Sequence, residues 1–244
     1  SWVCSSFVDD AFRPFKTDIV AGCQCGMGIL SYLKYWEYTG KGDAYLLDMA
    51  RAQGDYLVKE CNTTGEGVYP LFTRSTGNNT DFPLKKSSQG DSNYGENVIE
   101  PDKGGLAGYA LLKLYDATGG QPYLEQAIHN ADCLVKNMRP GTSEQAPWPF
   151  RVDSVTGQHW GERNGNMAFI LRLFDELLAK GHDKYQGPRD TLWKWVRDVQ
   201  IPAPDNRGES HWMQFFEDQV SYDNRTSWAP VSYTLLTLPT ILSV

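Results

Sequence analysis

Apolar residues along this chain gather in two kinds of stretch, and the two kinds follow each other in pairs. The stretch KGGLAGYALLKLYDATGG, residues 103–120, is apolar on nearly every face of a helix, which predicts a helix buried on all sides. In residues 122–138 the apolar positions recur at helical spacing on one stripe, which predicts an outer helix covering the inner one. The opposite side of this outer helix is polar, and we expect it to face solvent: Glu125, Gln126, His129 and Asn130.

The same pair of stretches occurs upstream at an offset of 77 to 79 residues. Residues 38–40 (YTG) align with 117–119 (ATG), and residues 57–59 align with 134–136, both LVK. A repeat of this length, built from helical pairs, is typical of a repeat architecture. Each outer stretch is followed by a strand-like segment that shares aromatic-Pro, Phe, Arg and Thr-Gly with its counterpart: VYPLFTRSTG, ending at Gly77, and WPFRVDSVTG, ending at Gly157.

A third, more diverged copy follows. Residues 164–181 are again apolar nearly all round, and residues 190–200 carry a stripe. The chain is therefore predicted to be all-α, with about three helical hairpins and short strand segments in the long loops.

The connections between these stretches are unequal. The links from each outer helix to the next inner helix, 62–103 and 139–164, are long and rich in polar and aromatic residues, whereas the links within a hairpin are short. If the inner helices run parallel, all the long connections gather at the N-terminal ends of the inner helices. We expect function on that side, because long loops in compact domains usually carry it.

A carboxylate precedes or opens each inner helix. These residues are Asp18, then Glu100 and Asp102, then Glu162. In a closed ring of hairpins they would point into one mouth, and paired carboxylates suit the cleavage of a glycosidic bond. We take Asp102 and Glu162 as the acid/base candidates, with Glu100 and Asp153 behind them. The alternative for Asp102 is a helix cap, because it stands directly before Lys103-Gly104-Gly105.

Aromatic and basic residues of the long connections are candidate substrate contacts, since aromatic rings offer flat apolar faces to sugars and arginine holds carboxylates or hydroxyls. Two alternatives stay open: Trp148 and Phe150 as plugs beneath the loop, and Arg74 with Arg151 as salt bridges between repeats. The candidates are Tyr94, Trp148, Arg151, His159, Trp160 and Trp212.

Composition narrows the class of protein. The chain has 244 residues, of which 41% are hydrophobic, enough for a sizeable core in one domain, and it contains no apolar run of transmembrane length. The net charge of -7 is spread without basic blocks, which argues against nucleic acid or an anionic membrane as partner. The five cysteines lack zinc-ligand spacing, so we expect buried thiols, no metal and no other cofactor.

Three Asn-X-Thr sequons, at Asn62, Asn78 and Asn224, suit a secreted or periplasmic protein. The start lacks an initiator Met and a signal-peptide pattern, which indicates a processed or truncated beginning. Residues 231–240 resemble the translation of a widely used transposase-type sequencing adapter and differ from it only at Leu235. We therefore expect a domain over residues 1–230 and a non-native tail over 231–244; the alternative is a natural β-like segment.

The repeated hairpins with long loops on one side, over residues 18–228, resemble the (α/α) toroid superfamily of six-hairpin glycosidase-like proteins. That resemblance implies an incomplete ring of about three hairpins where the family has six. Members of the superfamily include glycoside hydrolases such as the unsaturated glucuronyl hydrolases, several polysaccharide lyases, and sugar epimerases of the N-acylglucosamine type. No catalytic signature of one family is present, so no residue role is carried over.

The expected function is a carbohydrate-active enzyme, foremost a hydrolase of poly- or oligosaccharides. A lyase would need Tyr, His and Arg around an acidic sugar, for which Tyr94, His159 and Arg151 are available. An epimerase would need a paired acid and base around a monosaccharide. The alternative from a different class is a helical-repeat module that binds glycan or protein without catalysis.

Overall fold

The computed structural model describes residues 21–75 and 97–202, and these residues are mostly helical, as predicted. Three very short strands form one antiparallel sheet in the order β1-β2-β3. The α-helices are α1 (Ala21–Tyr38), α2 (Ala44–Lys59), α3 (Pro101–Thr118), α4 (Gln121–Lys136), α5 (Ala168–Ala179) and α6 (Gln186–Trp195). The strands are β1 (Val98–Ile99), β2 (Arg151–Asp153) and β3 (His159–Trp160); a 3₁₀ turn (Asp183–Tyr185) precedes α6 and a π-helical turn (Val196–Gln200) follows it.

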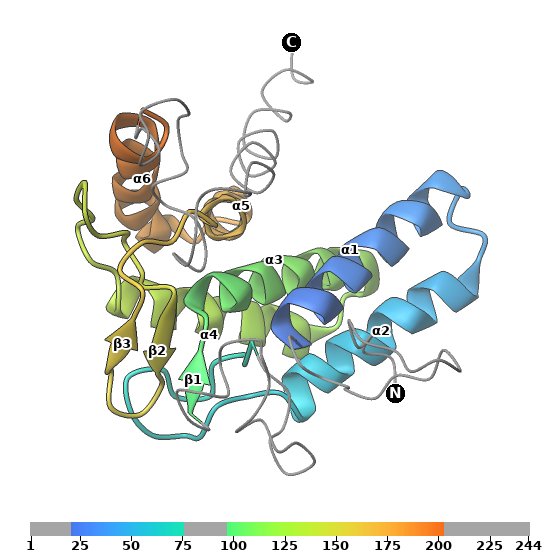
Figure 1. Cartoon of the computed structure of the whole chain (residues 1–244). Helices are drawn as coiled ribbons and strands as arrows, with labels where there is room; N and C mark the ends of the chain where they lie inside the picture. Colours follow the sequence, from blue (N-terminus) through green and yellow to red (C-terminus); the bar gives the residue numbers. More distant parts are fainter. Residues whose placement is uncertain (1–20, 76–96, 203–244) are drawn as a thin grey trace, which may run out of the picture.

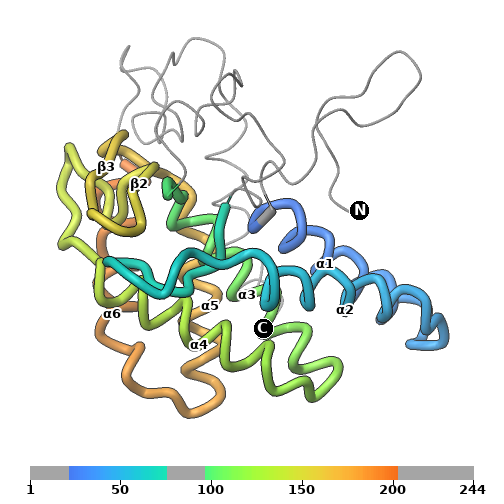
Figure 2. The backbone as a smooth tube through the Cα atoms, turned by 90° about the horizontal axis from the view of Figure 1, so that it is seen from below, coloured from blue at the N-terminus to red at the C-terminus, as the bar shows by residue number. Residues whose placement is uncertain are grey.

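Helix α3 lies at the centre of the described fold. It packs against α1 on one side, α5 on another and α4 behind, and the small sheet lies at its N-terminal end (Figure 1). The chain runs through consecutive helix pairs, α1 with α2, α3 with α4 and α5 with α6, as the backbone trace shows from below (Figure 2). Every described residue of α3 from Pro101 to Leu112 is buried, as the apolar pattern predicts.

Helices α1, α3 and α5 run parallel to one another. Gly22 of α1 lies beside the Lys103 carbonyl at the start of α3, and Gly26 lies beside Leu106 one turn later. On the other side of α3, Gly105 meets Ile170 of α5. The N-terminal ends of the three helices therefore gather on one side, which is the condition on which the predicted location of function depends.

Glycines let the neighbours of α3 approach closely. A Cβ atom at Gly104 would lie 2.1 Å from the ring of Phe72, and one at Gly105 would lie 2.5 Å from the Ile170 side chain. Glycine is required at both positions because close-packed interiors leave no room for an added methyl group. At the far end of α3, Gly119 adopts φ 70°, the left-handed conformation that ends a helix.

The polar face of α4 does not face solvent as expected. Asn130 is fully buried: its side-chain amide donates to Thr73 Oγ1 (2.9 Å) and to the Gly104 carbonyl (3.2 Å). His129 Nε2 lies 2.6 Å from the Pro70 carbonyl, and Gln126 donates to the Leu71 carbonyl at 2.9 Å. These contacts satisfy the Pro70 and Leu71 carbonyls in the loop after α2, while neighbouring residues of that loop pair through their own backbone groups, as Thr63 N–H does with the Phe72 carbonyl.

The asparagine of the first sequon, Asn62, uses its side-chain amide for structural hydrogen bonds. Asn62 Nδ2, the nitrogen that a glycan would modify, donates to the carbonyls of Leu57 (3.2 Å) and Val58 (2.7 Å) at the end of α2. This amide satisfies the last carbonyls of the helix. The sequons at Asn78 and Asn224, and the proposed tail 231–244, lie outside the described residues. Within residues 21–75 and 97–202, no helix is long and apolar enough to cross a membrane.

Substituting Gly104 by Ala is expected to lower the free energy of unfolding by about 1–3 kcal/mol, because the new methyl group would overlap the buried Phe72 ring. The measurement is urea unfolding followed by circular dichroism. Gly65→Ala is the control, since this exposed glycine of the loop after α2 has open space around its Cβ position and the substitution should be neutral or stabilising by up to about 1 kcal/mol. Equal effects of the two substitutions would contradict the packing argument.

Burial and the neighbouring Asp132 carboxylate raise the pKa of the Cys133 thiol to about 11. An unfolded thiol titrates near pH 8.5, so the contribution of this group to stability is complete below about pH 8.5 and is lost as the pH rises towards 11. We expect urea unfolding to show a smaller loss of stability between pH 8 and pH 10.5 in Cys133→Ala than in the wild type. An equal loss in both proteins would show that Cys133 does not titrate as described.

Candidate functional site

Three buried ionisable side chains and a fourth that is 12% exposed lie together at the N-terminal end of α3. Glu100, Asp102 and Lys103 come from the start of the helix, and Arg151 comes from β2. Lys103 Nζ lies 2.9 Å from Asp102 Oδ2 and 3.9 Å from Glu100 Oε2, and Arg151 Nη2 lies 3.5 Å from Glu100 Oε1. The two cations and two carboxylates compensate one another, which a buried charge requires.

The small sheet brings Arg151 to this cluster. Ile99 of β1 pairs with Val152 of β2, so Glu100, the next residue, reaches the level of Arg151 on the neighbouring strand. The guanidinium carbon of Arg151 also lies 3.9 Å from the centre of the Phe150 ring, a cation–π contact that holds the side chain flat. Arg151 is thus bound on one side by a carboxylate and on the other by an aromatic face.

Asp102 belongs to the first turn of α3 and is not its N-cap. The helix begins at Pro101, and the cap position is Glu100, whose side chain makes no capping hydrogen bond. The Asp102 carboxylate instead accepts from Lys103 Nζ and, through Oδ1, from the side-chain amide of Asn164 at 3.2 Å. The helix dipole favours a carboxylate at this end and disfavours Lys103, which therefore depends on its two acidic partners.

Glu162 lies on the segment between β3 and α5, and each of its two oxygens has a donor partner. Arg139 Nη1 lies 2.6 Å from Oε2, and His159 Nε2 lies 2.7 Å from Oε1. Its side chain is 37% exposed, so solvent and ligands can reach it. The two partners set the orientation of the carboxylate.

Asn164 connects the two candidate carboxylates. It is fully buried and contacts Asp102, and it follows Glu162 by only two residues along the chain. The segment that carries Glu162 therefore lies against the start of α3. The structure brings together Glu100, Asp102 and Arg151, whereas Glu162 and His159 pair with each other on the segment that Asn164 ties to Asp102.

Other sequence candidates lie elsewhere. Trp148 is fully buried and its indole N–H donates to the Leu134 carbonyl of α4 at 3.0 Å. It exposes no surface, and this burial agrees with the alternative of a plug beneath the loop rather than with a direct substrate contact. Trp160 is half-buried on β3 opposite Arg151. Tyr94 and Trp212 lie outside the described residues.

The Asp153 side chain stabilises the turn between β2 and β3. Its Oδ1 accepts the backbone N–H groups of Val155 (2.9 Å) and Thr156 (2.8 Å) in the connection between β2 and β3. Asp153 pairs with Val98, so it stands at the end of the sheet away from Glu100. The structure does not bring this carboxylate to the other three.

Three residues of the site were not chosen from the sequence: Lys103, Arg139 and Asn164. Lys103 stands between Asp102 and Gly104 in a stretch that is otherwise uncharged up to Lys113, which was a signal that it needed an acidic partner. Asn164 opens the third inner stretch, in the same place relative to its helix as the acidic residues before α3. Arg139 had no comparable signal, because it stands three residues after the end of α4 in an irregular connection.

Chemically, the site offers one accessible carboxylate, Glu162, and two buried ones, Glu100 and Asp102, of which Asp102 is held by a lysine and an amide. Nothing in the described ranges gathers three His, Cys, Asp or Glu side chains in a way that would hold a metal ion. No protein-family model matches the chain, and a search of the curated proteins finds no match.

Lys103→Met is expected to destabilise the protein by about 3–5 kcal/mol, because it leaves the buried carboxylates without their ammonium partner. The matched control is Lys59→Met in the exposed pair with Asp55 on α2, where a loss below about 1 kcal/mol is expected. Chemical unfolding at neutral pH measures both. If Lys103→Met lowers the free energy of unfolding as little as Lys59→Met does, water must reach the cluster in solution.

Proposed function

We propose that this protein is a carbohydrate-active enzyme that hydrolyses glycosidic bonds of a poly- or oligosaccharide, with Glu162 and Asp102 as its acid/base pair. The observation that carries the proposal is the hydrogen bond from Asn164 to Asp102, which holds the segment bearing Glu162 against the start of α3. Two carboxylates on facing segments are what glycosidic bond hydrolysis uses, one to protonate the leaving oxygen and the other as base or nucleophile.

The proposed fold is an incomplete (α/α) toroid of about three hairpins. The parallel, adjacent helices α1, α3 and α5 would form its inner row, and α2, α4 and α6 would cover them from outside. Two independent observations support this arrangement: α3 is buried on all sides, and the long connections meet at the N-terminal ends of the inner helices. The candidate carboxylates lie on that side.

Each carboxylate is positioned for a different task. Glu162 is accessible, and its two donors orient it towards whatever enters from solvent. Asp102 has one donor on each oxygen among the described residues, and a carboxylate can accept about four hydrogen bonds, so it keeps capacity for a water or a sugar hydroxyl. The proposal requires that substrate reach Asp102, whose side chain is 1% exposed.

The hydrolase is preferred to the lyase because the lyase residues are engaged with acids. His159 is paired with Glu162 and Arg151 with Glu100, and Tyr94, the third residue that a lyase would use, lies outside the described residues. The substrate would be a carbohydrate, and secretion or a periplasmic location would give access to a polymer. An enzyme of this kind needs no metal or cofactor for its chemistry.

The test is a screen on neutral and uronate-containing polysaccharides that reads both new reducing ends and the ultraviolet absorbance of unsaturated products. Reducing ends without unsaturation are expected for the wild type. Glu162→Gln should lower kcat by about 10²–10⁴-fold, because the amide can neither donate nor accept the catalytic proton. Asp102→Asn should lower kcat by a similar factor. Its unfolding curve must be measured as well, because Lys103 loses the nearer of its two acidic partners and the variant could be less stable.

The control is Glu144→Gln, on the same connection between α4 and α5. Glu144 is exposed and pairs with Arg163, so its loss should leave kcat within about twofold. Unsaturated products would show that the protein is a lyase and not a hydrolase. Full activity of Glu162→Gln in a folded protein would exclude Glu162 as the acid or base.

A further inference from the structure

Helices α1 and α2 form one edge of the described fold, beside α3 and α4 (Figure 1). Large side chains are exposed along this edge: Met27 and Tyr35 of α1 are 45% and 56% exposed, and Tyr45 in the first turn of α2 is 62% exposed. Met27, Ser31 and Tyr35 follow one another at intervals of four residues, which places them on one stripe of the helix. Exposed apolar stripes of this kind mark surfaces on which another protein segment packs.

A stripe at the corresponding positions of α3 shows what such a surface binds. Residues 26–40 align with residues 105–119 without a gap, and each stretch begins and ends with glycine. In this alignment the exposed stripe of α1 corresponds to three residues of α3: Leu106, Ala110 and Leu114.

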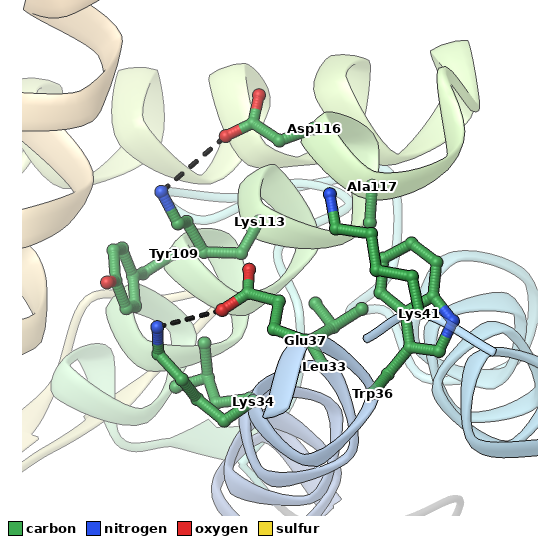
Figure 3. Close-up of a pocket in the computed structure, with 10 residues that line it drawn as sticks. Leu33, Lys34, Trp36, Glu37, Lys41, Tyr109, Lys113, Asp116 and Ala117 are labelled. Atoms are coloured by element: carbon green, nitrogen blue, oxygen red, sulfur yellow. Dashed lines mark hydrogen bonds and ion pairs between the residues drawn. The ribbon is translucent and has the colours of Figure 1, made fainter. Parts of the chain in front are cut away.

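One ion pair occurs at the same place in both helices and supports this register. On α1, Lys34 Nζ lies 3.0 Å from Glu37 Oε2. At the aligned positions of α3, Lys113 Nζ lies 3.6 Å from Asp116 Oδ2. Both pairs line the hollow between the two helices (Figure 3). Corresponding residues therefore occupy corresponding turns of α1 and α3.

On α3 this stripe is covered by the hairpin that precedes it. Leu106, Ala110 and Leu114 are all buried. A Cβ atom at Gly26 of α1 would lie 3.0 Å from the Leu106 side chain, and one at Gly54 of α2 would lie 2.3 Å from the Leu114 side chain. Glycines of α1 and α2 thus let that hairpin approach the stripe closely, because an added methyl group would find no room there.

The tyrosines that open the outer helices show the same difference. Tyr123, which aligns with Tyr45, is buried and donates its hydroxyl hydrogen to Asp55 of α2 at 2.7 Å. Tyr185, directly before α6, is also buried and donates to Asp132 of α4 at 2.8 Å. Each of these tyrosines is therefore bound by an aspartate of the preceding outer helix, whereas within residues 21–75 and 97–202 Tyr45 has no aspartate partner of this kind.

A second copy of the described hairpins has no spare aspartate to offer to Tyr45. Asp55 and Asp132 stand in the pattern Asp-x-Leu-Val-Lys, which occurs at these two places only in the chain. Both already accept from a tyrosine of the next hairpin. The residues before these aspartates are small, glycine in α2 and alanine in α4, so the tyrosine ring can lie against the helix. These features define the partner that the edge fits.

From these contacts we infer that the edge of α1 and α2 binds a further helical hairpin of the same kind. The inner helix of this hairpin would offer a glycine to Met27, as Gly26 does to Leu106. Its outer helix would offer a small residue followed by an aspartate to Tyr35 and Tyr45. The inference depends on the correspondence between the hairpins and not on the proposed hydrolase activity.

The test supplies such a hairpin from the chain itself. A copy of residues 21–99 is inserted directly before Ala21, so that original and copy stand 79 residues apart, the offset between α1 and α3. The copy carries Tyr35→Phe and Tyr45→Phe, which lets mass spectrometry distinguish its peptides from those of the original. In the matched control the copy also carries Gly54→Leu and Asp55→Lys, which remove the close approach and the acceptor.

Nitration by tetranitromethane, located by mass spectrometry, measures the exposure of the original Tyr35 and Tyr45. Both should react about tenfold more slowly in the duplicated protein than in the unmodified chain, because the copy covers them. In the matched control the rates should stay within about twofold of those of the unmodified chain. Unchanged rates in the duplicated protein, or equal protection in the control, would overturn the inference. Lower solubility of the duplicated protein than of the unmodified chain would overturn it as well, since a covered apolar surface should associate less.

The unmodified chain provides a second test. Tyr123→Phe should lower the equilibrium constant for folding about tenfold, because Asp55 loses a donor, whereas Tyr45→Phe should change it less than about twofold. Equal losses would mean that Tyr45 already has a partner within the chain. Light scattering should show a monomer. A dimer that Tyr35→Ser dissociates would assign the edge to a second copy of the chain and contradict the proposed hairpin.

Discussion

The fold depends on the close contact of α3 with the elements around it. Helix α3 is buried along almost its whole length, and a helix without a polar face is stable only if neighbours cover every side. Gly104 and Gly105 make this cover possible, because the Phe72 ring and α5 lie where a larger side chain would stand. The parallel course of α1 and α5 beside it follows from the same packing, and so does the gathering of the long connections at one end.

The N-terminal end of α3 then becomes the most polar part of the interior. Burying ionisable groups costs more than burying apolar side chains of the same volume, so such a cluster is weak evidence for stability and stronger evidence for function. Its members come from two segments that only the fold brings together, the start of α3 and strand β2, and Asn164 of the segment before α5 donates a hydrogen bond to it. The hydrogen bond from Asn164 to Asp102 is the link between the buried carboxylate and the accessible one.

The polar face of α4 plays a structural role that hydropathy does not reveal. An outer helix with a polar side is usually solvated there, but this side binds the loop after α2 through Asn130, His129 and Gln126. The loop pairs partly with itself, and the α4 side chains satisfy carbonyls such as those of Pro70 and Leu71 that these backbone pairs leave over. Phe72, which packs against Gly104, belongs to the same loop, so the polar contacts of α4 also hold the apolar cover of α3.

The sequence by itself determined the mostly helical character of the chain and the burial of α3 on every side, because both depend on hydrophobic periodicity along the chain. It could not determine that Trp148 is a buried plug, that Asp153 serves a turn, or that Lys103 and Asn164 hold Asp102. Asn164 and Asp102 are 62 residues apart, and Asn130 and Thr73 are 57 apart. Only the path of the connecting loops determines such contacts. A polar side chain could hydrogen-bond to many others in the sequence, and tertiary packing decides which of them lies within reach.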